Sequence, residues 1–184
     1  LYLNGKSLFP IFNFENNAPS NRTREVYAGS DSILIIEGIH ALNPVMHNNL
    51  YAKNILKIYV SMNTQFTHRD RVIYTPQTAR YVRRLIRDYN FRGQPIERTA
   101  EMWVNVCAGE AKYIRPFKDS ADMWIDSAMN YEACVFHHFF YNLLEENKYE
   151  YIPEIQKLYD LFDYFDDIDE KKIPKNSLLK EFIP

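Results

Sequence analysis

The chain contains two kinds of apolar pattern, short continuous runs and longer stretches in which apolar residues recur every three or four positions. The short runs at 32–38 and 55–61 are rich in β-branched and other apolar residues, a pattern typical of strands in a parallel sheet, and 121–126 is a third short run. We predict strands at residues 32–38, 55–61 and 121–126. We predict helices at residues 43–53, 78–89, 97–112, 131–146 and 153–165. Strands that alternate with helices favour an α/β fold with crossover connections.

The two ends of the chain differ from this pattern. Residues 1–30 are polar and irregular, which predicts a loop or a small hairpin. Residues 145–172 hold ten acidic residues against four lysines, which we interpret as a solvated face. Residues 174–184 are expected to form a docked tail or a short helix, with Asn176 or Ser177 as its cap. We therefore expect an α/β core at 1–128 and a C-terminal helical extension, packed on it, at 129–184.

Positive charge is concentrated on one predicted helix. Eight of the eleven arginines fall between Arg69 and Arg98. Within 78–89 the arginines follow the i, i+3, i+4, i+7 spacing of one helical face, at Arg80, Arg83, Arg84 and Arg87. Val82, Leu85, Ile86 and Tyr89 gather on the opposite side, and Gly93 and Pro95 end the helix. Guanidinium groups bind phosphate oxygens in pairs, so this face suits a polyphosphate, a nucleic-acid backbone or acidic side chains.

Composition narrows these choices. The net charge is −2, and no wider basic surface accompanies the arginine row, which argues against nucleic acid as the partner. No run approaches the roughly 20 apolar residues of a membrane span, and no signal peptide is recognisable, so we expect a cytoplasmic protein without a membrane partner. Cys107 and Cys134 lie far apart, which argues against a disulfide framework or a thiolate metal site. Because the sequence does not begin with Met, we expect it to start inside a longer protein.

Glu37 is the most informative acidic residue. It follows the apolar run 32–36 and precedes Gly38, a position from which α/β sheets present a carboxylate to Mg²⁺. A magnesium carboxylate and an arginine row are the two halves of a phosphoryl-transfer site. Asn4 to Ser7 look like the end of a phosphate-binding loop, but the glycine that this loop requires before Gly5 is not in the chain, so we do not assign Lys6 to phosphate.

Several strings together resemble a known family. Residues 35–44 (IIEGIHALNP), 79–93 and 103–116, followed by Ala121 and Asp122, are similar to the uridine kinase branch of the P-loop kinases. The chain most resembles bacterial uridine kinase-like proteins whose kinase module follows a TGS-type and synthetase-like N-terminal region. Residues 161–165 and 176–183 are also similar to segments of those proteins. The resemblance implies part of a P-loop NTPase-type parallel sheet with flanking helices, so that 1–128 would be a partial kinase core.

The resemblance also implies roles for individual residues. Glu37 occupies the position of a Mg²⁺ ligand. Arg84, Arg87 and Arg92 fall on the arginines of a lid that closes over the phosphates of ATP, and Arg84 and Arg87 would be catalytic by stabilising the transferring γ-phosphoryl group. ATP as co-substrate and Mg²⁺ are therefore the expected cofactors.

The nucleoside side departs from the family pattern. Phe12 and Asn13 stand where uridine kinases carry a Tyr and an Asp, within a Pro-x-Tyr-Asp-Phe pattern. Arg22 or Arg24 would fall near the basic residue of that substrate loop, so Phe12 and Arg22 are the expected substrate-binding residues. Gln94 replaces an arginine found in some members. The loss of a hydroxyl and a charge weakens the case for uridine as the nucleoside.

We therefore expect the C-terminal portion of an ATP-dependent nucleoside kinase that phosphorylates a 5′-hydroxyl. The P-loop and the catalytic aspartate would precede Leu1, so this chain alone would be inactive. Three alternatives stay open: a degenerate kinase fold that binds RNA or another phosphate ligand, a related transferase such as phosphoribulokinase or pantothenate kinase, and arginines that only pair with the acidic C-terminal helices. The sequence leaves the nucleoside and the oligomeric state undecided, and it allows a homo-oligomer.

Overall fold

The structure, a computed structural model, describes residues 5–13, 18–47, 54–147, 149 and 152–183. Contacts divide the chain into two units, Leu1–Gly38 and Ile39–Pro184. The expected division at residues 128 and 129 is a different one and stays a prediction.

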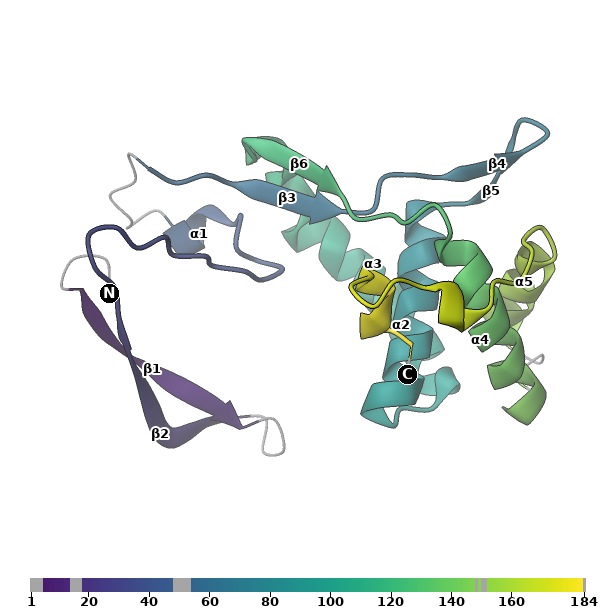
Figure 1. Ribbon diagram of the computed structural model, residues 1–184, viewed down its shortest axis with the longest axis horizontal. Helices are drawn as coiled ribbons and strands as arrows, with labels where there is room; N and C mark the ends of the chain where they lie inside the picture. The colour runs from purple at the N-terminus through teal and green to yellow at the C-terminus, as the bar shows by residue number, and fades with distance from the viewer. Residues whose placement is uncertain (1–4, 14–17, 48–53, 148, 150–151, 184) are drawn as a thin grey trace. The chain divides into compact units, whose positions relative to one another are not determined.

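The first unit contains a β-hairpin. Strands β1 (Lys6–Asn13) and β2 (Ala18–Tyr27) pair antiparallel, with Lys6 opposite Tyr27 and Asn13 opposite Ala18 (Figure 1). The hairpin was one of the two forms predicted for residues 1–30. Lys6 lies within it and forms an ion pair with Glu25, whose carboxylate is 2.5 Å from its ammonium nitrogen.

The predicted strand at 32–38 is wrong. Residues 32–37 form neither a strand nor a helix. The side chains of Ile33, Leu34, Ile35 and Ile36 are 89%, 54%, 84% and 59% exposed. A continuous apolar run forms a buried strand only where neighbouring strands satisfy its backbone and cover both its faces, and no described segment pairs with this one. The run is therefore an exposed apolar segment.

The second unit contains a small parallel sheet. Strand β3 (Ile58–Ser61) pairs parallel with β6 (Met123–Asp126), with Ile58 opposite Met123 and Ser61 opposite Asp126. Both strands lie inside the predicted ranges, and their parallel pairing confirms a mixed α/β arrangement. Strands β4 (Phe66–His68) and β5 (Arg71–Tyr74) form a hairpin that the sequence analysis did not predict. Helix α1 covers Pro44–His47, and residues 48–53 of the helix predicted at 43–53 lie outside the described residues.

Helix α2 (Pro76–Arg92) is the arginine helix, and local signals explain both its ends. The Thr75 side chain accepts a hydrogen bond from the Thr78 backbone N–H at 3.1 Å, and Pro76 occupies the first turn, where a missing N–H costs nothing. Gly93 ends the helix in the left-handed conformation, at φ 60°. The helix is longer than the predicted 78–89 because the periodicity argument did not use the Thr75 and Pro76 signal.

The other helices of the second unit are close to their predicted positions. They are α3 (Ile96–Tyr113), α4 (Glu132–Asn147) and α5 (Pro153–Phe162), with short 3₁₀ turns η1 (Arg115–Ser120), η3 (Glu170–Lys172) and η4 (Leu178–Glu181). Helix α2 packs against both α3 and α4 (Figure 1). Ser177 caps η4 by accepting a hydrogen bond from the Leu179 N–H, as one of the two predicted caps.

The hydrophobic core of the second unit joins α2 to the C-terminal helices. Its fully buried members come from β5, α2, α3, α4, α5 and the C-terminal segment, and include Tyr74, Val82, Leu85, Ile86, Ile96, Phe136, Phe140, Ile155, Phe162, Leu179 and Ile183. The apolar side of α2 is therefore fixed, which holds its arginines on the opposite side. Within the described part of the chain, no helix has the length and apolar character required to span a bilayer.

Candidate phosphate-binding site on helix α2

The predicted two-sided character of α2 is present in the structure. Val82, Leu85 and Ile86 are at most 1% exposed. Arginines on the other side line an open hollow of about 180 Å³; its lining residues are Arg80, Arg83, Arg84, Arg87, Trp103, Val106 and Phe182. Pockets for whole ligands typically measure roughly 300–1,000 Å³, so this hollow has room for part of a ligand, such as phosphate groups.

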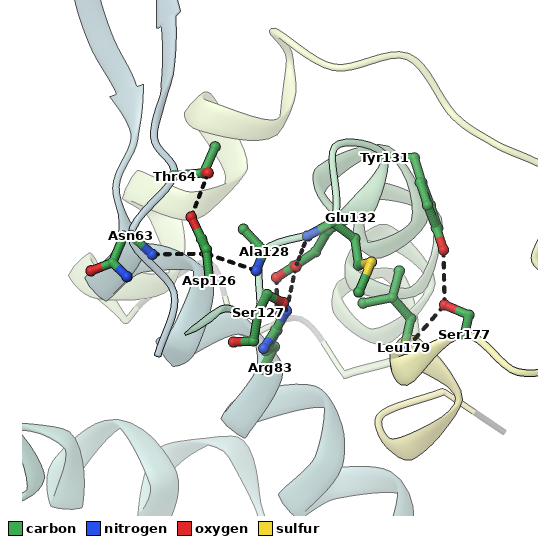
Figure 2. Close-up of polar contacts among 11 residues, drawn as sticks. Asn63, Thr64, Arg83, Asp126, Ser127, Ala128, Tyr131, Glu132, Ser177 and Leu179 are labelled. Carbon is green, nitrogen blue, oxygen red and sulfur yellow. Dashed lines mark hydrogen bonds and ion pairs between the residues drawn. The ribbon is translucent and has the colours of Figure 1, made fainter. Parts of the chain in front are cut away.

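Arg83 is anchored to α4. Its Nε and Nη2 donate to the two carboxylate oxygens of Glu132 at 2.9 and 2.5 Å, and Nη2 also donates to the Ser127 carbonyl oxygen at 2.9 Å (Figure 2). The Glu132 side chain is only 1% exposed, and burial raises its pKa despite the opposing effect of Arg83. A buried pair of this kind is costly to break, because the remaining charge would have no partner. Arg83 therefore holds α2 in place.

Asp88 links two further arginines. Its carboxylate accepts a hydrogen bond from Arg92 Nη1 at 2.8 Å, and its other oxygen lies 3.1 Å from Arg84 Nε. The Thr99 hydroxyl donates to that second oxygen at 3.3 Å. Asp88 is 1% exposed, so it is a buried carboxylate between two arginine side chains that are 22% and 49% exposed.

Arg80 and Arg87 are the first and last of the four α2 arginines that line the hollow. Arg80 Nη1 lies 2.5 Å from a carboxylate oxygen of Glu110, which also pairs with Arg115. Arg87 Nη1 lies 3.4 Å from Glu181 in η4, a side chain that is 63% exposed. The Phe182 ring lies 5.2 Å from the guanidinium carbon of Arg83 and 5.7 Å from that of Arg87. Arg87 therefore has the longest and most exposed carboxylate contact of the four arginines that line the hollow.

The arginines of α2, taken together with Arg115 of η1, outnumber their carboxylate partners. Six guanidinium groups, those of Arg80, Arg83, Arg84, Arg87, Arg92 and Arg115, contact four carboxylates, those of Asp88, Glu110, Glu132 and Glu181, which leaves two positive charges. Each guanidinium carries five N–H donors, so one carboxylate contact does not exhaust it. Such a surface can bind an additional anion through charge-assisted hydrogen bonds.

The hypothesis that the arginines only pair with the acidic C-terminal helices can be compared with the ion pairs that the structure describes. Arg83 pairs with Glu132 in the first turn of α4 and Arg87 with Glu181 in η4, both in the C-terminal part of the chain. Arg80 pairs with Glu110 on α3 and Arg84 with Asp88 on its own helix, so the C-terminal part accounts for two of these four pairs. These are specific, mostly buried contacts.

Three predicted site residues belong to the first unit. Phe12 lies opposite Pro19 in the hairpin and is 44% exposed, Arg22 lies in β2, and Glu37 is exposed beyond the hairpin. The predicted arginines belong to the second unit. A common site that contains Phe12, Arg22, Glu37 and the arginines therefore stays a prediction.

The acidic residues of the chain can be tested as ligands for the expected Mg²⁺. Among the residues described, no three His, Cys, Asp or Glu side chains gather as a metal-binding group. Glu37 would supply a single carboxylate. Mg²⁺ usually keeps several waters and takes one or two carboxylates together with substrate phosphates, so one exposed glutamate fits that mode of binding.

The sequence analysis missed the carboxylates that hold the arginines. Asp88 had a usable signal, because it lies four residues from both Arg84 and Arg92 on one helix. Glu132 and Glu181 had none, since they are 49 and 94 residues away from their partners in the sequence.

Comparison with known proteins identifies the family of the chain. The sequence profile of the Phosphoribulokinase / Uridine kinase family matches residues 2–132. The chain is 30% identical over 117 residues to proteins named uridine kinase from Borrelia turicatae (strain 91E135) and Borrelia hermsii (strain HS1 / DAH), an alignment that covers 63% of this chain and 48% of each relative. The chain thus spans about half the length of these relatives. No solved structure matches it significantly. A profile that covers most of the chain, including the whole arginine helix, shows that the chain belongs to the phosphoribulokinase/uridine kinase family.

Proposed function

We propose that the natural protein containing this chain is a nucleoside kinase that transfers the γ-phosphoryl group of ATP to a nucleoside 5′-hydroxyl. In this proposal the chain contributes its arginine helix, α2, as the part that contacts the phosphates. The supporting observation is the hollow lined by four arginines of α2, which together with Arg92 and Arg115 outnumber their carboxylate partners by two. The family and the uridine kinase relatives support the reaction class.

The four arginines would have different tasks. Arg83 is committed to Glu132 and Ser127, so its role is to fix the helix. Arg87 contacts only an exposed glutamate at 3.4 Å among its described carboxylate partners, and is the arginine most easily recruited by an anion. Arg84 and Arg92 would add charge beside it. Positive groups aimed at the transferring phosphoryl group stabilise the charge of the transition state, which usually contributes most of the catalysis.

The remaining parts of the site are proposed from the family resemblance. Glu37 would hold Mg²⁺, which neutralises charge on the phosphate oxygens. Phe12 and Arg22 would contact the nucleoside. Since Phe12 provides an aromatic face without a hydroxyl, it would hold a base by stacking rather than by hydrogen bonding. We propose the cytoplasm as the location of this reaction.

Replacement of Arg87 by alanine tests the proposal. In the natural full-length protein, we expect Arg87→Ala to lower kcat for nucleoside phosphorylation by about 10²-fold, because it removes a charge partner of the transition state. Steady-state kinetics with ATP, Mg²⁺ and a panel of nucleosides would measure this. The loss should persist at saturating ATP.

Arg98→Ala is the matched control. Arg98 is 61% exposed on α3 and contacts Glu101 at 3.5 Å, away from the arginines that line the hollow. Its loss should leave kcat within about twofold of wild type, as expected for an exposed ion pair. If Arg87→Ala turned over as fast as Arg98→Ala, the proposed role of α2 would be incorrect.

A phosphate-binding module without turnover is the alternative. It predicts binding of labelled RNA that weakens steeply with salt, together with no nucleoside phosphorylation by the full-length wild-type protein. Titration of RNA and of ATP with Mg²⁺ at two salt concentrations separates the two functions. RNA binding without ATP binding would favour the module.

A further inference from the structure

We infer that Asp88 is a positioning residue that orients Arg84 and Arg92 toward the phosphates of ATP. The inference rests on the proposed function, because it assigns a task within the same site. Asp88 itself is buried and would not contact the substrate.

The first argument is geometric. Arg84 and Arg92 lie one helical turn before and after Asp88, so all three side chains project from the same side of α2. The carboxylate divides its two oxygens between them, one at 2.8 Å from Arg92 Nη1 and the other at 3.1 Å from Arg84 Nε. One buried acid therefore fixes two flexible cations that would otherwise sample many rotamers.

The second argument concerns the donors that remain. Arg92 uses Nη1 for Asp88, and Arg84 approaches it only through Nε, at an angle that does not form a hydrogen bond. This carboxylate does not contact the two terminal nitrogens of Arg84. It also leaves Nη2 and Nε of Arg92 unused. Because one negative charge faces two positive charges, the group keeps a net positive charge. Asp88 thus orients the two arginines without neutralising them.

The third argument is that Asp88 also fixes the end of the helix and its neighbour. Its backbone carbonyl accepts hydrogen bonds from the N–H groups of Gly93 and Gln94. Its carboxylate accepts the Thr99 hydroxyl of α3. The segment that carries Arg92 is therefore tied, through a single residue, both to the arginine row and to the next helix.

Asp88→Asn is the direct test, in the full-length protein. Asparagine keeps the shape but has no charge and turns an amide N–H toward an arginine. We expect kcat/KM for ATP to fall by about tenfold or more, in the range found when groups that orient a charged site are removed, with KM for the nucleoside unchanged. If the role of Asp88 were merely structural, Asp88→Asn would lower the melting temperature, and it would not reduce kcat/KM for ATP selectively while KM for the nucleoside stayed unchanged.

Two further variants complete the test. Thr99→Val removes one hydroxyl contact to Asp88 in a side chain of similar shape, and should lower kcat/KM for ATP by about threefold at an unchanged nucleoside KM. If Asp88→Asn does not fold, Thr99→Val decides the matter, and a wild-type kcat/KM for ATP would overturn the inference. Glu101→Gln, in an exposed pair on the same helix, is the control that should change neither parameter.

The outcomes separate this inference from the proposed function. If Arg87→Ala loses turnover while folded Asp88→Asn keeps the wild-type kcat/KM for ATP, the positioning role is wrong and the proposed function stands. If Arg87→Ala keeps full turnover, the proposed function fails irrespective of Asp88.

Discussion

Asp126 shows how a single residue joins distant parts of the chain. It ends β6, and its carboxylate accepts hydrogen bonds from the Asn63 N–H at 3.0 Å, the Thr64 hydroxyl at 2.7 Å and the Ala128 N–H at 2.9 Å (Figure 2). Burial by itself would raise the pKa of Asp126, but the hydrogen bonds from Thr64, Ala128 and Asn63 outweigh it and lower the pKa. The ends of β3 and β6 are thereby held together.

Asp126→Asn should accordingly destabilise the fold in a pH-dependent way. A carboxyl group with a lowered folded-state pKa contributes stability above its unfolded-state pKa, here the ordinary value of 3.8, and loses it as the pH falls through the folded-state pKa. The wild type should therefore be more stable than the variant at pH 7, and the difference should shrink below about pH 3.8. Urea unfolding at pH 7, 5 and 3 measures it.

An equal difference at all three pH values would contradict the hydrogen-bonded carboxylate as its source. Asp119→Asn, in the η1 turn, provides a control for the loss of a negative charge from the same protein.

For single residues on α2, the arginine spacing alone predicted which side chains face away from the core. It could not predict that Arg83 is structural, because its partner Glu132 is distant in sequence and reaches it only through the packing of α4 on α2. Arg84 and Arg92 could have been linked to Asp88 from their spacing of four residues.

Among the elements, helices α2 and α3 contain two glycines with opposite roles. Gly93 ends α2 at φ 60°, a left-handed conformation that is strained for other residues. Gly109 lies inside α3 without such a φ, where the flexibility of glycine weakens the helix. Space does not distinguish them, since a Cβ at either position meets no atom within 4 Å.

We therefore expect Gly93→Ala to destabilise the protein by about 1 kcal/mol and Gly109→Ala to stabilise it by roughly 0.5–1 kcal/mol. Each variant serves as the control for the other, because the added methyl group is the same. Thermal melts of both variants measure the effect. Equal shifts of the same sign would show that backbone conformation is not the cause.

The elements that could be predicted were those with their own local signals. Helix α2 has a cap, a proline at its start and a glycine at its end, and strands β3 and β6 lie in short, mostly apolar runs. The run 32–38 has an equally clear pattern, yet it forms no strand here, because strand formation depends on partners that periodicity does not reveal.

Considered as a whole molecule, the chain contains an arginine helix whose ion-pair partners are defined in detail. The charge pattern predicted an anion-binding helix, and the family explains which anion to test. The positions of Phe12, Arg22 and Glu37 with respect to that helix follow from neither composition nor spacing, since they depend on how separate units assemble.

The exposed run at 33–36 has a consequence for handling the protein. Four neighbouring apolar side chains without a covering partner favour self-association. We expect the 184-residue chain, produced by itself, to form concentration-dependent oligomers in light scattering, and Ile33→Lys combined with Ile35→Lys to reduce them. Val104→Lys, at an isolated apolar side chain on α3 that is 73% exposed, should leave the size distribution unchanged.

If the double variant associates as strongly as wild type, another surface is responsible. If the expectation holds, a lack of activity in a preparation of this chain would not test the role of its arginines, because the sample would consist of aggregates. The choice of protein preparation would then decide what a kinetic measurement means.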